Sequence, residues 1–305
     1  MHRTALLARA HSADRTPTVM PCCALAIVCG IVLAGCGNGG DEPSGRAAES
    51  SATATATARN AAVGREIDIG GRSLWLSCAG EGGPTVVLVH GQGQDLSSLA
   101  GIQTAESKET RTCSYDRAGQ GRSDPGPRPQ TVQHMVGDLF ELLRVAEVKP
   151  PYVLVGHSLG GPIVWAAATE HPDKVAGFIS MNGVPRASDW MPRVLPRFTR
   201  SERRDERAYY RGDNDEQVDF IASDASLKRG KPPDEMPYII MHGTNCQGDD
   251  LCSRTQDVAL RLDRGLAQVS RGGRLVTVDA GHEIYIDKPE AVVGAISDLH
   301  TAATR

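Results

Sequence analysis

The chain is poor in the features that mark nucleic-acid-binding, metal-binding and membrane-spanning proteins. Its 305 residues include 33 Lys and Arg against 37 Asp and Glu, and only 4% are aromatic. The absence of a basic stripe with interleaved aromatic side chains argues against a nucleic-acid partner. Neither two Cys-x-x-Cys pairs nor a group of nearby histidines occurs, so no metal site is expected. The apolar stretch at residues 22–34 is too short to predict a membrane span.

The first 36 residues have the pattern of an export signal. Arg3, Arg9 and Arg15 give a positive start, and the apolar stretch that follows ends in small residues. Leu33-Ala34-Gly35-Cys36 resembles the lipobox of bacterial lipoprotein signals, in which the cysteine is acylated and becomes the new N-terminus. The resemblance implies lipidation at Cys36 and an exported protein anchored in the cell membrane; the alternative is an ordinary signal peptide and a secreted protein. A start at Met20 would remove the basic residues and weaken this interpretation.

Composition divides the remaining chain into a linker and one domain. Residues 37–63 contain Gly, Ser, Asp, Glu and an alternation of Ala and Thr, with almost no large apolar side chains. Such a segment buries too little surface to offset its ordering entropy, so a disordered linker is expected. Residues 64–305 suit one large α/β domain.

Four of the eight cysteines lie in the export segment, which leaves Cys78, Cys113, Cys246 and Cys252. An even number in an exported chain predicts disulfides, although four cysteines allow three connectivities. Spacing favours a small loop closed by Cys246 and Cys252. Cys78 ends one predicted strand and Cys113 opens another, so antiparallel pairing of these strands would bring the two within bonding range. The alternative is four reduced thiols, which export disfavours.

Apolar runs predict an alternation of strands and helices. Residues 66–69 and 73–78 flank Gly70-Gly71-Arg72 and predict a hairpin. Further strands are predicted at 85–89, 112–115, 151–155, 175–181, 238–241 and 275–278, and helices at 132–146 and 290–301. This order indicates a mostly parallel sheet covered by helices on both faces.

The most informative pattern is Gly156-His157-Ser158-Leu159-Gly160. It lies between a predicted strand and a predicted helix, the arrangement in which a sharp turn pushes a serine out of the sheet as a nucleophile. A Cβ at position 156 or 160 would collide with the neighbouring strand or helix, so both glycines have a steric role.

With these motifs in this order, residues 66–300 resemble the α/β-hydrolase family. The resemblance rests on His90-Gly91-Gln92-Gly93, on the segment from Asp116 to Asp124, on the serine turn and on Ala280-Gly281-His282. It implies an α/β-hydrolase fold with a mostly parallel central sheet of about eight strands, helices on both faces and a small cap insertion. Asp116 and Arg117 are expected to brace the fourth strand rather than to take part in catalysis.

Ser158 needs a base, because a serine hydroxyl is a poor nucleophile until its proton is removed. His282 is the predicted base, since it follows a strand and lies at the same edge of the sheet as Ser158. The histidines at positions 90, 134, 157, 171 and 242 are in weaker places. The family resemblance assigns the oxyanion donors to the backbone N–H groups of Gln92 and Leu159, the latter at a helix N-terminus that favours negative charge.

The acid that orients the base is the least secure member of the predicted triad. The family places it where this chain has Cys246, and a second family position holds Asn182, which cannot stabilise an imidazolium by charge. Asp249 and Asp250 follow in the loop that a Cys246–Cys252 disulfide would close. Asp250 is favoured because Gly248-Asp249-Asp250 mimics the usual Gly-x-Asp approach.

Residues 184–237 differ from their surroundings because they are rich in Arg, Asp and Glu, with scattered large aromatic residues. In the family such an insertion forms a small helical cap whose apolar residues line the acyl pocket. The alternative is a solvated surface excursion.

These residues predict a serine hydrolase that cleaves an ester or related acyl bond of a small molecule through an acyl-enzyme, without metal or organic cofactor. One alternative is an aminopeptidase or amide hydrolase with the same triad. Another is a surface lipoprotein that binds a ligand without turnover. Serine at position 158 disfavours the aspartate-nucleophile relatives, epoxide hydrolases and dehalogenases. The sequence predicts neither a particular substrate nor an oligomeric state.

Overall fold

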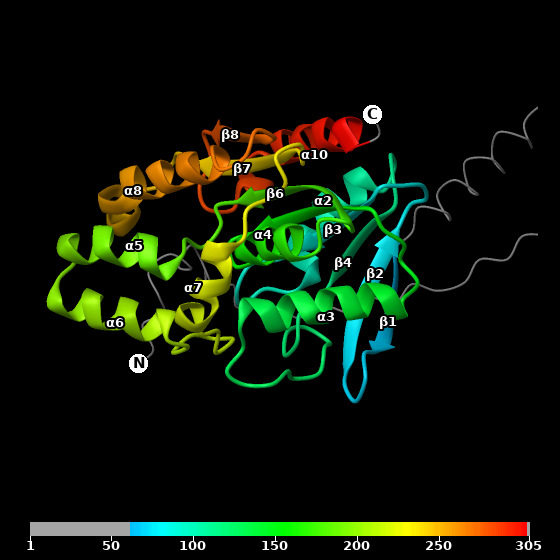
Figure 1. Cartoon of the computed structure of the whole chain (residues 1–305), viewed down its shortest axis with the longest axis horizontal. Coiled ribbons are helices and arrows are strands. Elements are labelled where there is room, and N and C mark those ends of the chain that lie inside the picture. The colour runs from blue at the N-terminus through cyan, green and yellow to red at the C-terminus, as the bar shows by residue number, and fades with distance from the viewer. Residues whose placement is uncertain (1–61, 304–305) are drawn as a thin grey trace, which may run out of the picture. The chain divides into compact units, whose positions relative to one another are not determined.

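The computed structural model describes residues 62–303, which contain an eight-stranded sheet with the order β1-β2-β4-β3-β5-β6-β7-β8 (Figure 1). The strands are β1 (Val63–Asp68), β2 (Ser73–Ala79), β3 (Thr85–Val89), β4 (Thr112–Tyr115), β5 (Tyr152–His157), β6 (Val175–Met181), β7 (Tyr238–Gly243) and β8 (Gly273–Val278). β2 pairs antiparallel with β1 and β4, and the other pairs are parallel. The predicted fold class is confirmed.

Helices follow most of the strands. They are η1 (Leu96–Leu99), α2 (Ala100–Glu106), α3 (Val132–Val145), α4 (Gly160–Glu170), α8 (Asp250–Ala267), α9 (Ile284–Asp287) and α10 (Pro289–Ala303). Between β6 and β7 lie α5 (Ala187–Val194), η2 (Leu195–Arg197), α6 (Arg200–Tyr210) and α7 (Phe220–Arg229). The export signal, the lipobox and nearly all of the predicted linker lie outside the described residues, whereas the last linker residue, Val63, begins β1.

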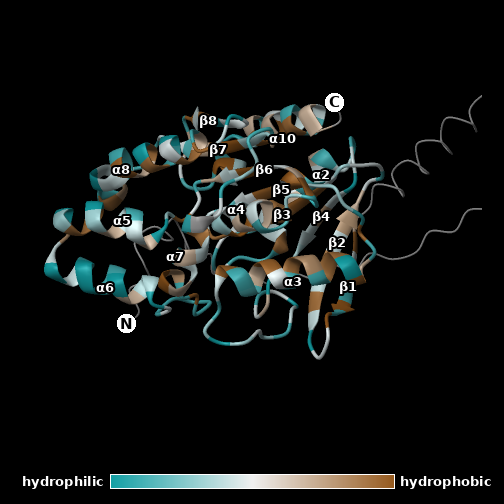
Figure 2. Cartoon of the chain, viewed as in Figure 1, coloured by the Kyte–Doolittle hydropathy of each residue, from teal (hydrophilic) through white to brown (hydrophobic). Residues whose placement is uncertain are grey.

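Burial on both faces explains why the central strands have continuous apolar sequences. In β3, Val87 and Val89 belong to a hydrophobic cluster with residues of α3, α4 and α8. The alternating residues Val86 and Leu88 belong to a second cluster with residues of α2 and α10. Figure 2 shows apolar colour on central strands such as β5 and polar colour on outer helices such as α6.

Both predicted disulfides are present. Cys78 and Cys113 are direct partners in the antiparallel β2–β4 pair, with their Cα atoms 4.1 Å apart. Cys246 and Cys252 join the middle of the β7–α8 loop to the first turn of α8. The strand pairing is therefore the geometric reason for the first bridge, and the short loop for the second.

The segment between β6 and β7 is helical and has its own apolar interior. Tyr209 stacks on Phe220 with ring centroids 5.5 Å apart, and Tyr210 packs against both rings. Trp190 is buried and donates its indole N–H to Glu206 at 2.7 Å. These aromatic side chains, expected to line an acyl pocket, are thus largely used to hold the helices together.

No helix within residues 62–303 has the length and apolar character needed to cross a membrane.

Candidate active site

Ser158 lies on the tight turn between β5 and α4 with a φ of 51°, in the left-handed region that non-glycine residues rarely adopt. Hydrogen bonds on both sides hold this conformation. The Ser158 N–H donates to the Met181 carbonyl at 2.9 Å, and the Ser158 carbonyl accepts from Gly161 at 2.9 Å and from Val184 at 3.1 Å. The strain is therefore supported by β6, by α4 and by the start of the cap.

The two glycines of the turn are sterically required. A Cβ on Gly156 would run into the Gly160 carbonyl at the start of α4, and a Cβ on Gly160 would run into the Val89 carbonyl at the end of β3. The turn can therefore be this tight only because both positions lack a side chain.

His282 lies in the loop after β8, at the same edge of the sheet as the serine turn. The ring of His157, the residue directly before Ser158, lies 4.8 Å from the His282 ring between centroids. The His157 Nε2 lies 3.0 Å from the His282 carbonyl, so this nitrogen carries the proton and donates. Asn182 donates its side-chain amide to the same carbonyl at 2.9 Å. The backbone of the predicted base is thus fastened to β5 and β6.

The His282 ring itself has no hydrogen-bond partner among the described residues. Burial lowers the pKa of His282 to about 4, and no neighbouring carboxylate opposes this effect. The imidazole is therefore neutral at pH 7 and able to accept a proton, but the imidazolium that would form lacks a charged partner in this arrangement.

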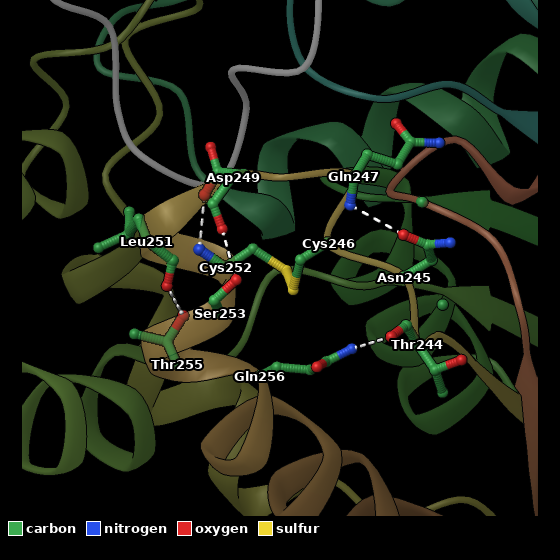
Figure 3. Close-up of a disulfide and its surroundings, with 12 residues drawn as sticks. Thr244, Asn245, Cys246, Gln247, Asp249, Leu251, Cys252, Ser253, Thr255 and Gln256 are labelled. Carbon is green, nitrogen blue, oxygen red and sulfur yellow. Dashed lines mark hydrogen bonds between the residues drawn. A yellow bond between two sulfur atoms is a disulfide. The ribbon is translucent and has the colours of Figure 1, made fainter.

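The two aspartates considered for the triad acid lie at the start of α8, where Figure 3 shows Asp249 beside Cys252. Asp249 is the N-cap residue and accepts from the Cys252 N–H at 2.6 Å. Asp250 forms an ion pair with Arg254 at 2.9 Å, and its side chain is 84% exposed. The structure thus places the Asp250 carboxylate in solvent and not at His282, because a helix N-terminus and an arginine one turn later both attract it.

A different carboxylate, that of Asp287, bonds the histidine loop, residues 279–283 between β8 and α9. Asp287 accepts from the Gly281 N–H at 2.7 Å and from the Gln247 side-chain amide at 2.8 Å. Gln247 belongs to the loop beside the Cys246–Cys252 disulfide and packs over Gly281, where a Cβ would collide with it. Asp287 therefore holds the backbone next to His282, a role that sequence reasoning did not assign to it.

The predicted oxyanion donors follow two neighbouring strands of the sheet, β5 and β3. The N–H of Leu159 precedes α4, and the N–H of Gln92 lies in the loop after β3. Neither N–H donates to another described residue, so both remain available to an oxyanion.

Residues 90–95, the loop that carries Gln92 and is called the oxyanion loop below, are held in place by side chains of the cap. Tyr209 donates its hydroxyl to the Gln92 side-chain oxygen at 2.6 Å, and Gln92 donates its amide to Asn214 at 2.7 Å. The next N–H, of Gly93, donates to Glu216 at 2.9 Å. The cap thus contacts the oxyanion loop through side chains at three points.

Another buried histidine–carboxylate pair lies apart from the histidine loop. His242, at the end of β7, places its Nδ1 2.7 Å from a carboxylate oxygen of Asp263 in α8. Both side chains are buried, and burial raises the pKa of Asp263. This pair was not predicted. In the described part of the chain, no group of three or more His, Cys, Asp or Glu residues could hold a metal ion.

The order of strands, the serine turn and the histidine loop agree with a comparison against known families. The profile described as "Alpha/beta hydrolase family" matches residues 86–295, more than half of the chain. The chain belongs to the alpha/beta hydrolase family.

Individual relatives are more distant. YqjL of Bacillus subtilis (strain 168) is 35% identical over 94 residues, which are 30% of this chain and 37% of that protein. Epoxide hydrolase B of Mycobacterium tuberculosis is 31% identical over 103 residues, 33% of this chain and 29% of that protein. The matches thus span about a third of these curated relatives. The enol-lactonase of Burkholderia xenovorans LB400 superposes with a TM-score of 0.55 at 24% identity, over 78% of this chain and 100% of that one, and so shares the fold.

Proposed function

We propose that this alpha/beta hydrolase is a serine hydrolase that cleaves an ester or related acyl bond of a small molecule. The observation that carries the proposal is the Ser158 turn: a strained serine between a buried strand and a helix. The free N–H groups of Gln92 and Leu159 and the neutral imidazole of His282 supply the remaining parts of an acyl-transfer site.

In this mechanism His282 takes the proton from the Ser158 hydroxyl as the oxygen attacks the substrate carbonyl. The negative charge that develops on the carbonyl oxygen is stabilised by the N–H groups of Gln92 and Leu159. His282 then gives the proton to the leaving group, which departs and leaves an acyl-enzyme. Water, deprotonated by His282, attacks this ester and restores the free serine.

Ester hydrolysis tests the proposal directly. We expect wild-type protein to hydrolyse at least one of a panel of p-nitrophenyl esters, and Ser158→Ala to lose about 10⁴-fold or more in kcat. Equal rates for wild type and Ser158→Ala would show that the turnover comes from elsewhere. Aminoacyl amides in the same panel test the alternative, an aminopeptidase or amide hydrolase with the same residues.

The identity of the orienting acid stays a prediction, with Asp250 favoured over Asp249. Both carboxylates are bound at the start of α8, so a role for Asp250 requires its loop to turn toward His282. If Asp250 orients the base, Asp250→Asn should reduce kcat severely while Asp249→Asn has a smaller effect. Near-normal kcat in both variants would remove both aspartates from the mechanism.

No carboxylate bonds the His282 ring among the described residues. This observation favours a second candidate function, that of a surface protein that binds a ligand without turnover. A stable covalent fluorophosphonate adduct requires an activated serine and would exclude this candidate. A wild-type protein that stays unlabelled would support it.

We also propose that the protein is exported and anchored by lipid at Cys36. Two disulfides support export, because such bonds persist in oxidising compartments. Cys36→Ala should move the protein from the membrane fraction to the soluble fraction, whereas the control Cys29→Ala should leave it in the membrane. Continued membrane association of Cys36→Ala would contradict acylation at that residue.

A further inference from the structure

An ion pair that is almost completely buried joins the cap to the segment after β4. Arg117, after β4, and Glu216, between α6 and α7, each expose 1% of their side chain. The guanidinium lies 2.5 Å from one carboxylate oxygen and 3.3 Å from the other. A charged pair this deeply buried is costly unless further hydrogen bonds satisfy it.

Those further hydrogen bonds go to the oxyanion loop. Arg117 donates to the carbonyl of Gly91 at 2.9 Å and also to the carbonyl of His90. Glu216 accepts from the N–H of Gly93 at 2.9 Å. The ion pair therefore bonds the loop on both sides of Gln92. Arg117 bonds the two carbonyl groups before it, and Glu216 bonds the N–H group after it.

Because a peptide unit is planar, these bonds also fix the direction of the oxyanion donor, the Gln92 N–H. The carbonyl of Gly91 and the N–H of Gln92 belong to one trans peptide unit and point in opposite directions. Because Arg117 holds the carbonyl toward the core, the N–H must face the other way, and it has no acceptor among the described residues. The same carbonyl also lies 2.9 Å from His90 Nδ1 and accepts from the Gln94 N–H at 3.4 Å, and Arg117 adds the charged partner.

We propose that Glu216 and Arg117 are positioning residues for catalysis, which set the orientation of the Gln92 N–H and so make the oxyanion site depend on the docked cap. The inference rests on the proposed serine hydrolase activity. Tyr209 and Asn214 reinforce the pair by fixing the Gln92 side chain.

Removing only one partner is a poor first test, because Glu216→Gln leaves the Arg117 charge buried without a counter-charge and endangers the fold. The double variant Arg117→Met/Glu216→Leu removes both charges and keeps apolar volume, so it is expected to fold. The carbonyls of His90 and Gly91 lose the guanidinium and the Gly93 N–H loses its carboxylate acceptor, so the Gln92 peptide is held less firmly. Glu206→Gln is the matched control, since Glu206 is also a buried glutamate of the cap but bonds Trp190 and not the oxyanion loop.

The readout compares an ester with its thiono analogue, whose C=S sulfur accepts hydrogen bonds poorly and gains little from an oxyanion site. In the double variant, kcat for the ester should fall about 10²–10³-fold with little change in KM, and the ester-to-thionoester ratio of kcat/KM should fall with it. Glu206→Gln should keep the wild-type kcat and ratio. A folded double variant with the wild-type kcat and ratio would overturn the inference, as would an equal loss in Glu206→Gln. Fluorophosphonate labelling of the wild type distinguishes failure of this inference from failure of the proposed function. A wild type that is not labelled would contradict the serine hydrolase activity itself.

Discussion

Acidification should leave the rate of ester hydrolysis almost unchanged down to about pH 5, because a low pKa keeps the proposed base, His282, neutral at that pH. His282 acts as a base only when neutral. Burial lowers the pKa of His282 to about 4 from its ordinary value of 6.5, and no described carboxylate lies close enough to raise it again. The activity should therefore persist well below the pH at which an ordinary histidine becomes charged.

The size of the effect is large enough to measure. At pH 5 a histidine with the ordinary pKa is neutral in about 3% of molecules, whereas one with a pKa near 4 is neutral in about 90%. The two cases differ about thirtyfold in kcat/KM at that pH, and the lowered pKa corresponds to about 3 kcal/mol against the imidazolium form.

The assay is kcat/KM for a p-nitrophenyl ester between about pH 4 and pH 8, with product measured at a wavelength that does not depend on its ionisation. Circular dichroism at each pH must accompany it. Burial lowers the pKa of His90 and His157 as well, so the unfolded state binds more protons than the folded state below about pH 6.5. Stability is then complete above that pH and falls as the pH drops toward the folded pKa values.

A kcat/KM profile that falls on the acid side near pH 6.5 or above, in protein that is still folded, would refute the reasoning. Such a profile would indicate that Asp250 or another carboxylate reaches His282 in the working enzyme.

Two further predictions concern stability. Cys78→Ala/Cys113→Ala removes a bridge that closes a 35-residue separation and should lower the free energy of unfolding by about 4 kcal/mol in urea titrations; an unchanged midpoint would contradict the bridge. Asp263→Ala leaves buried His242 without its acceptor and should lower the free energy of unfolding by about 1–3 kcal/mol. The exposed control Asp257→Ala should lower it by less, and similar losses for both would contradict a special role of the buried pair.

The central strands were predictable because their side chains are buried on both faces. The boundaries predicted for β3, β4 and β6 agree with the structure. β3 is an apolar run that follows a proline, and charged or polar residues flank both β4 and β6. The Ser158 turn was predictable for a steric reason, because two close backbone approaches restrict positions 156 and 160 to glycine.

The partners of the site were harder to predict because they are far apart in the sequence. Arg117 and Glu216 are 99 positions apart, and Glu216 lies in a charged segment whose composition alone suggests a solvated surface. Only the folded cap shows that this carboxylate is buried.

The acid illustrates a second difficulty, because one short pattern fits two structures. Asp249 and Asp250 match the approach to a triad acid, but an aspartate followed by a periodic helix is equally a helix N-cap. In the structure the capping interaction is formed, and the pattern Gly248-Asp249-Asp250 by itself fits both structures equally well.

The most direct test of the account is to locate the covalent adduct that a fluorophosphonate forms. Mass spectrometry of the digested, labelled wild-type protein should place a single adduct on Ser158, and Ser158→Ala should remain unlabelled under the same conditions. Labelling at another residue, equal labelling of Ser158→Ala, or no labelling of folded wild type would contradict the claim that the strained turn carries an activated nucleophile.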